Sequence, residues 1–106
     1  MLKRVKRRYL ALAIDSDKAF DSKQFMDAVW GAVGKLYGEY GASKSGLKLI
    51  DFDAKERFAV IRVSLVAVDM VRAALASITR IGNDVVAVHV LSVSGTIKAL
   101  HEKTRL

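Results

Sequence analysis

Two short segments, one near each end of the chain, contain the residue types that hold phosphate groups. The first eight residues include five Lys and Arg side chains, which form either a phosphate-neutralising arm or a solvated tail. Near the other end, Ser94-Gly95-Thr96 precedes a predicted helix, where free backbone N–H groups and a hydroxyl either bind an anion or form a plain cap. The residues predicted to contact phosphate are Lys3, Arg4, Lys6, Arg7, Arg8, Ser94, Gly95, Thr96 and Lys98.

The chain offers no arrangement of side chains suited to catalysis. Such catalysis needs a nucleophile beside a base, or two carboxylates in different environments. The one carboxylate cluster, Asp15, Asp17 and Asp21, is interpreted as a solvated loop that leads into a helix cap. Because the chain has no Cys and neither His89 nor His101 has a ligand at chelating spacing, we expect no catalytic residue, no metal site and no bound cofactor.

The composition indicates a small basic domain with a core of its own. The 106 residues allow one domain, predicted over residues 1–106 with a basic arm over about residues 1–7. The 18 Lys and Arg exceed the 11 Asp and Glu, which gives a net charge of +7 and favours a polyanionic partner. No apolar run reaches membrane-spanning length and no export signal is present, so we expect a soluble, cytoplasmic protein with no membrane partner.

The apolar periodicity predicts elements in the order β-α-β-β-α-β, followed by a short helix. This order is typical of the α+β ferredoxin-like or RRM-like sandwich, in which two helices cover one face of a four-stranded antiparallel sheet. The first and third strands then lie in the middle. The predicted strands span residues 8–14, 47–52, 57–63 and 84–91, and the predicted helices span residues 21–40, 64–80 and 97–103.

Caps and glycines define the predicted helices. Asp21 or Ser22 begins the first helix, Ser64 begins the second, and Gly82-Asn83 ends it. Three glycines gather on the face of the first helix opposite its apolar stripe, where they either admit a close neighbour or have none. The apolar stripe, expected to be core, consists of Phe25, Val29, Ala32, Val33, Leu36 and Tyr40.

Alternation along the strands predicts a sheet with two apolar faces. One face, with Leu10, Leu12, Ile14, Ala59, Ile61 and Val63, belongs under the helices. The other is too apolar to meet only water, so we expect it to be covered by the C-terminal helix through Ile97 and Leu100, or by a second protein chain. Apart from Tyr9 and Phe58, it lacks the glycine and the further aromatic residues of an RNA-recognition motif, so we expect no sequence-specific single-strand binding there. The residues assigned to a partner interface are Tyr9, Phe58, Val60, Arg62 and His89.

Three segments carry a family likeness: residues 6–12 (KRRYLAL), residues 71–75 (VRAAL) and residues 90–100 (VLSVSGTIKAL). Together they resemble the archaeal ribonuclease P protein component 2 family, which is related to the Pop/Rpp14 subunits of eukaryotes. The resemblance implies a non-catalytic, RNA-binding subunit of a ribonucleoprotein that removes the 5′ leader from precursor tRNA. It also implies that the ribonuclease P RNA carries the magnesium-dependent chemistry. The implied protein partners are component 3, a TIM-barrel-like subunit, and a second copy of this chain, in a heterotetramer.

A second hypothesis comes from the fold class rather than from the family. Some ferredoxin-like domains self-associate through their sheets and bind a small metabolite for regulation. Such a domain would bind its ligand in a defined pocket and would show no salt-dependent RNA binding. The loop of residues 15–22 contains no glycine, and this disfavours the hypothesis because backbone approach to a ligand usually requires one there.

Overall fold

Four strands form one antiparallel sheet in the computed structural model, which describes residues 6–103. They are β1 (Arg7–Asp15), β2 (Lys48–Asp53), β3 (Phe58–Ser64) and β6 (Ala87–Ser94). The sheet order is β2-β3-β1-β6, so the first and third strands are central, as predicted. The α+β sandwich with a four-stranded antiparallel sheet is therefore confirmed.

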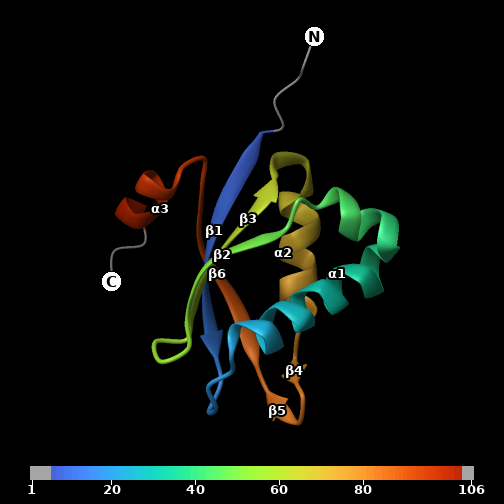
Figure 1. The fold of residues 1–106 in the computed structure, drawn as a ribbon, viewed down its shortest axis with the longest axis vertical. Helices are drawn as coiled ribbons and strands as arrows, with labels where there is room; N and C mark the ends of the chain where they lie inside the picture. Colours follow the sequence, from blue (N-terminus) through green and yellow to red (C-terminus); the bar gives the residue numbers. More distant parts are fainter. Residues whose placement is uncertain (1–5, 104–106) are drawn as a thin grey trace.

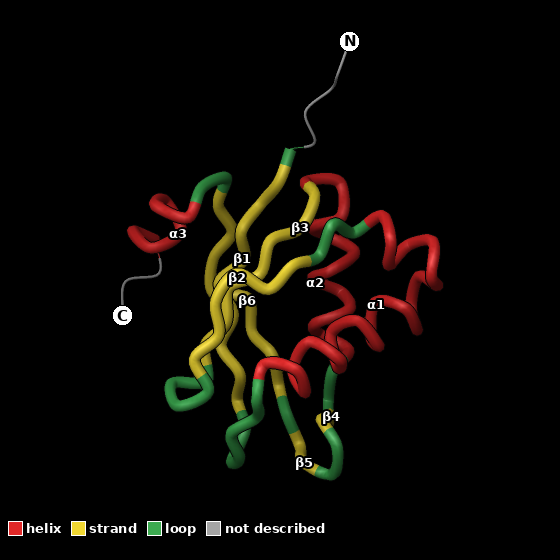
Figure 2. Tube along the Cα trace, viewed as in Figure 1, coloured by secondary structure: helices red, strands yellow, loops and turns green. Residues whose placement is uncertain are grey.

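Helices cover both faces of this sheet. α1 (Ser22–Lys44) and α2 (Val68–Ser77) lie together on one face, and the short α3 (Ile97–Lys103) lies on the other (Figure 1). A 3-10 turn, η1 (Leu65–Ala67), joins β3 to α2. A separate two-stranded ribbon, β4 (Arg80–Ile81) and β5 (Asp84–Val85), extends beyond one end of the sheet (Figure 2). No helix within residues 6–103 has the length and apolar character needed to span a bilayer.

The main core lies between the sheet and the two long helices. β1 is apolar throughout its middle because helices cover both of its faces, and Leu10, Ala11 and Leu12 are all inaccessible to solvent. Phe25 of α1 packs on Phe52 of β2, with their ring centroids 5.7 Å apart. The inward-facing set predicted from strand alternation is confirmed as part of this core: Leu10, Leu12, Ile14, Ala59, Ile61 and Val63.

α1 begins where the sequence predicts and continues beyond the predicted end. Asp21 forms a capping box, in which its carboxylate accepts from the Gln24 N–H at 2.7 Å. The helical path is interrupted at Gly38, whose φ is 75° and ψ is 178°. The predicted core positions Leu36 and Tyr40 are wrong, since they are 48% and 75% exposed. Only the first half of α1 is buried against the sheet, and the half around the kink extends past it (Figure 1).

α2 is shorter than the sequence predicts, because the residues expected at its two ends have other structural roles. The Ser64 hydroxyl does not cap a helix; it donates to the carbonyl groups of Lys44 and Ser45 at 3.2 and 3.1 Å, which ties β3 to the end of α1. The helix ends at Ser77, and Gly82, with φ of 63°, forms the β4–β5 turn instead of ending α2. The fourth strand of the sheet accordingly starts later than expected, at residue 87.

Two glycines of α1 give opposite predictions for the same substitution. A Cβ added at Gly34 or at Gly38 would meet no atom within 4 Å, so only the backbone conformation separates them. We expect Gly34→Ala to raise the free energy of unfolding by up to about 1 kcal/mol. We expect Gly38→Ala to lower it by about 1–3 kcal/mol, because its φ and ψ values are almost restricted to glycine. Urea denaturation measures both, and equal effects would contradict the kink.

Candidate functional site

Strand pairing brings the two predicted phosphate-holding segments to the same end of the sheet. Tyr9, near the start of β1, pairs with Ser94 at the end of β6. The next residues on each side, Arg8 and Gly95, are consequently neighbours: a Cβ on Gly95 would lie 3.6 Å from Nη1 of Arg8. The ends of the sequence that looked independent therefore form one surface, at the top of Figure 1.

The basic arm is anchored where it enters the sheet. The carbonyl of Lys6 accepts from the N–H of Leu65 at 2.8 Å, and the Arg8 Nη1 donates to the carbonyl of Arg7 at 2.9 Å. Lys6 and Arg7 are exposed and Arg8 is half-buried. Lys3 and Arg4, which belong to the same predicted set, lie outside the described residues.

The hydroxyls of the second segment serve the start of α3. Thr96 Oγ1 accepts from the Ala99 N–H at 3.1 Å, and Ser94 Oγ accepts from the Thr96 N–H at 3.4 Å. Ser94 is also buried, so its side chain has a structural part here. Gly95, Thr96 and Lys98 are exposed. Of these three, Lys98 carries the charge that could bind an anionic ligand.

Within the part of the chain that the structure describes, the cations at this end of the sheet have no counter-ion. Among residues 6–103, one ion pair forms, between Lys18 and Asp84 at 3.5 Å, and it lies at the opposite end. Asp69 and Glu102 are close in sequence to the cationic end but make no ion pair within the described chain. Positive charges without neutralising partners raise the local potential and attract polyanions. We call this surface the cationic end: Lys6, Arg7, Arg8, Lys48, Arg62 and Lys98.

Lys48 also belongs to this surface, although its place in the sequence does not predict it. Its cross-strand partner is Arg62, which in turn pairs with Tyr9. The signal that could have found it was strand register, since Lys48 begins β2 where the antiparallel β3 ends. That register depends on a bulge between Leu49 and Asp51, which period-two alternation does not anticipate.

The face opposite the long helices carries a second, smaller core under α3. Leu100 is 1% exposed and packs on Ala11 and Val60, so the predicted cover by the C-terminal helix is confirmed at this residue. It is wrong at Ile97, which is 39% exposed. The covered residue Val60 meets a partner chain only if α3 moves away.

The residues assigned to a partner interface divide between the two ends of this face. Phe58 and His89 both pair with Ala13 and form a row at the end away from the arm. Tyr9 and Arg62 lie together at the cationic end. The assigned set therefore contains two separate surfaces with the α3 contact between them.

The carboxylate loop lines a hollow of about 230 Å³ together with residues 85–87. Asp15 and Asp17 are exposed, and Asp21 is committed to its helix cap. The described residues include no group of three His, Cys, Asp or Glu that could hold a metal ion.

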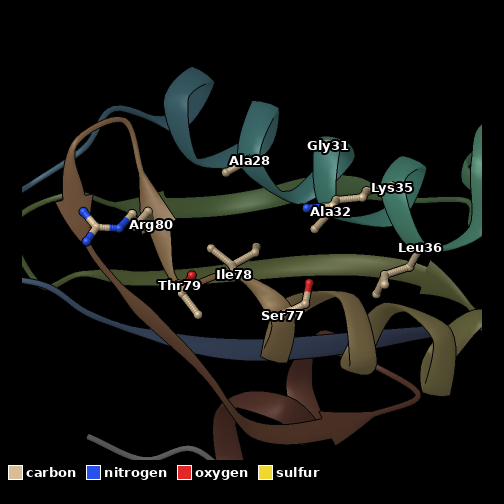
Figure 3. A pocket seen from close by; sticks show the side chains of 9 residues that line it. All are labelled: Ala28, Gly31, Ala32, Lys35, Leu36, Ser77, Ile78, Thr79 and Arg80. Carbon is tan, nitrogen blue, oxygen red and sulfur yellow. The ribbon is translucent and has the colours of Figure 1, made fainter.

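A groove of about 360 Å³ runs between α1 and the end of α2. In Figure 3, Leu36 and Ile78 face its interior, while the guanidinium of Arg80 points away toward the β4–β5 turn. The Ser77 hydroxyl in its wall already donates to the Ala74 carbonyl at 2.6 Å. Because a metabolite site needs polar groups that converge on one point, the groove gives no support to the metabolite hypothesis.

Comparison with known proteins decides the family. The model of the Rpp14/Pop5 family matches residues 8–105. The chain belongs to the Rpp14/Pop5 family. Among its relatives, "Ribonuclease P protein component 2" of Thermococcus kodakarensis is 34% identical over 100 residues, covering 94% of this chain and 83% of that protein. The protein of the same name from Methanosarcina mazei is 32% identical, covering 94% of this chain and 84% of the relative.

The fold of this Rpp14/Pop5 family member also matches a solved structure. A chain in the cryo-EM structure of yeast ribonuclease MRP superposes with a TM-score of 0.69, covering 91% of this chain and 79% of the yeast chain. The sequence identity is 18%, so this likeness concerns the fold alone. The family match begins at Arg8, so it includes residues 94–98 but leaves out Lys6 and Arg7 of the cationic end.

Two apolar residues of α3 test how this Rpp14/Pop5 chain covers its outer face. We expect Leu100→Ala to lower the free energy of unfolding by about 2–3 kcal/mol, because it leaves a cavity over Ala11 and Val60. Ile97→Ala is the matched control, and we expect its effect to stay below about 1 kcal/mol because its side chain is partly exposed already. Urea denaturation gives both values, and equal losses would show that α3 is not held by Leu100.

Proposed function

We propose that this chain is a non-catalytic protein subunit of ribonuclease P, which binds the ribonuclease P RNA and supports removal of the 5′ leader from precursor tRNA. The observation that carries the proposal is the Rpp14/Pop5 match over residues 8–105, together with relatives named as ribonuclease P protein components. The cationic end supports it independently, because a polyanion is the partner that unpaired cations attract.

The protein would act as counter-charge for folded RNA. Lys and Arg contacts to phosphate position a protein on RNA without reading its sequence. We assign these contacts to the arm, with Lys3, Arg4, Lys6, Arg7 and Arg8, and to the adjoining segment with Gly95, Thr96 and Lys98. Neutralised phosphates let RNA helices approach one another, and this would stabilise the active RNA with its bound substrate.

The chemistry in this proposal belongs to the RNA. The described side chains present no nucleophile with an adjacent base and no cluster of metal ligands. We therefore place the magnesium ions on the RNA, and we expect the protein to contribute affinity and stability. The proposed location is the cytoplasm.

A protein partner fits the end of the outer face away from the arm. Phe58 is half-buried and His89 is exposed in the row that they form with Ala13. We propose this row as a contact for a component 3-type subunit with a TIM-barrel-like fold, within a heterotetramer that contains two copies of this chain. RNA and protein partners would then occupy opposite ends of the same sheet.

Reconstitution tests the proposed function directly. We expect the ribonuclease P RNA with its component 3-type subunit to cleave precursor tRNA faster at low magnesium when this chain is added, because protein cations replace part of the ionic screening. The measurement is the rate of 5′ leader release with and without the chain. No stimulation would contradict the proposal, and cleavage by the chain without any RNA would contradict its non-catalytic role.

The arm makes a separate, salt-dependent prediction. Replacing its five cations together (Lys3, Arg4, Lys6, Arg7 and Arg8) by Gln should weaken RNA binding by roughly a hundredfold at low salt, with a smaller loss as salt rises. The control replaces five exposed cations elsewhere: Lys18, Lys23, Lys35, Lys55 and Arg72. Filter-binding titrations at several salt concentrations give the affinities, and equal losses in the two variants would contradict a specific role for the arm.

A further inference from the structure

Lys48 and Arg62 form a cationic pair on the outer face of the sheet, beyond the two segments assigned to RNA above. They are direct cross-strand partners on β2 and β3, and Arg62 is also the partner of Tyr9 on β1. The neighbouring positions Ile50 and Val60 belong to the outer cluster under Leu100. Because successive side chains alternate between faces, Arg62 projects on the same outer face as Val60.

Among residues 6–103, the guanidinium of Arg62 finds no acceptor. Its Nε is buried and has no hydrogen-bond partner, and the side chain makes no ion pair within residues 6–103. Arg57 provides the comparison: its Nε is also buried without a partner, but its Nη2 donates to the carbonyl of Asp17 at 3.1 Å. The Arg57 side chain is therefore hydrogen-bonded to the protein backbone, whereas the charge of Arg62 has no partner within residues 6–103.

The position of α3 leaves this pair accessible. α3 contacts β6 and β1 and lies on that side of the outer face (Figure 1). Lys103 holds it there by donating to the Val93 carbonyl at 3.1 Å. Lys48 is exposed and Arg62 is half-exposed, so a ligand can reach both from the side of β2.

We propose that Lys48 and Arg62 bind the phosphate backbone of RNA, so that the RNA-binding part of the cationic end extends from the arm and residues 95–98 onto β3 and β2. Arg7 on β1 is two residues from Tyr9, so it lies diagonally next to Arg62 and makes the positive surface continuous from the arm to β2. Adjacent strands are about 5 Å apart, and such a row of cations suits the closely spaced charges of a nucleic-acid backbone.

The packing of the apolar side chains beside this pair, added to its charge, favours RNA over an acidic protein as its occupant. A protein interface usually centres on a desolvated apolar patch with few charges, and the apolar residues nearest to this pair are already packed under Leu100. The inference rests on the proposed function, and it moves Arg62 from the protein-interface set to the RNA-binding set.

The test compares Lys48→Gln/Arg62→Gln with a control pair, Lys23→Gln/Lys55→Gln, from the opposite end of the sheet. The probes are the in vitro transcribed ribonuclease P RNA and, separately, the component 3-type subunit. We expect the first variant to lose roughly tenfold in RNA affinity at low salt, and its log–log salt slope to fall by about 1.4–1.8 for two lost phosphate contacts. The control should keep its RNA affinity within about twofold of the wild-type value and should leave the salt slope nearly unchanged. We expect Arg62→Lys, which retains the charge that Arg62→Gln removes, to keep most of the RNA affinity.

Each outcome separates this inference from the proposed function. If the Lys48 and Arg62 variant binds RNA normally while the arm variant does not, the inference is overturned and the proposed function stands. If the variant loses the component 3-type subunit and keeps RNA, the surface is a protein interface and the inference is also overturned. Loss of RNA binding without loss of the cooperative thermal transition, with recovery by Arg62→Lys, supports it.

Discussion

The antiparallel pairing of β1 with both β3 and β6 is the constraint on which the rest of the structure depends. It places the start of β1 beside the end of β3 and the end of β6, so the residues before β1 and after β6 share one surface. The same pairing sends the acidic loop after β1 to the other end, beside the β2–β3 turn and the start of β6. The carboxylates of that loop thus lie away from the cationic end, which has no carboxylate partner within the described chain.

The two faces of the sheet differ in how completely they are packed. The inner face builds the main core with α1 and α2, which requires only apolar volume of the right shape. The outer face carries a small cluster held by Leu100, and the ends of this face remain free on either side of α3. Arg62 and Lys48 lie at one end, whereas Phe58 and His89 lie at the other. The surfaces proposed for RNA and for a protein partner therefore do not overlap on the sheet.

Local patterns were sufficient to predict the order of the main elements, the central place of the first and third strands, and the inward-facing core, but not the β4–β5 ribbon. These depend on short-range periodicity, and the apolar run of residues 10–12 is unambiguous because both of its faces are buried. The errors arose where tertiary contacts outweigh local preference. Ser64 is a good helix cap by type, but its hydroxyl bonds the end of α1 instead. Tyr40 continues the apolar stripe, but the helix bends at Gly38 and leaves it exposed.

Most residues of the site could be predicted from the sequence, but the contacts that bring them together could not. The arm and residues 94–98 stand out by composition, but their contact through Arg8 and Gly95 depends on strand pairing. Lys48 joins them only through a register set by a bulge.

The central claim, that the cationic end faces RNA, is tested most directly by tethered hydroxyl-radical cleavage. The chain has no cysteine, so a single Cys at Lys98 or at Lys55 can carry an iron chelate in the reconstituted complex. The account predicts strong, localised cuts in the ribonuclease P RNA from the Lys98→Cys position and weak cuts from Lys55→Cys. Cuts from position 55 alone would contradict it.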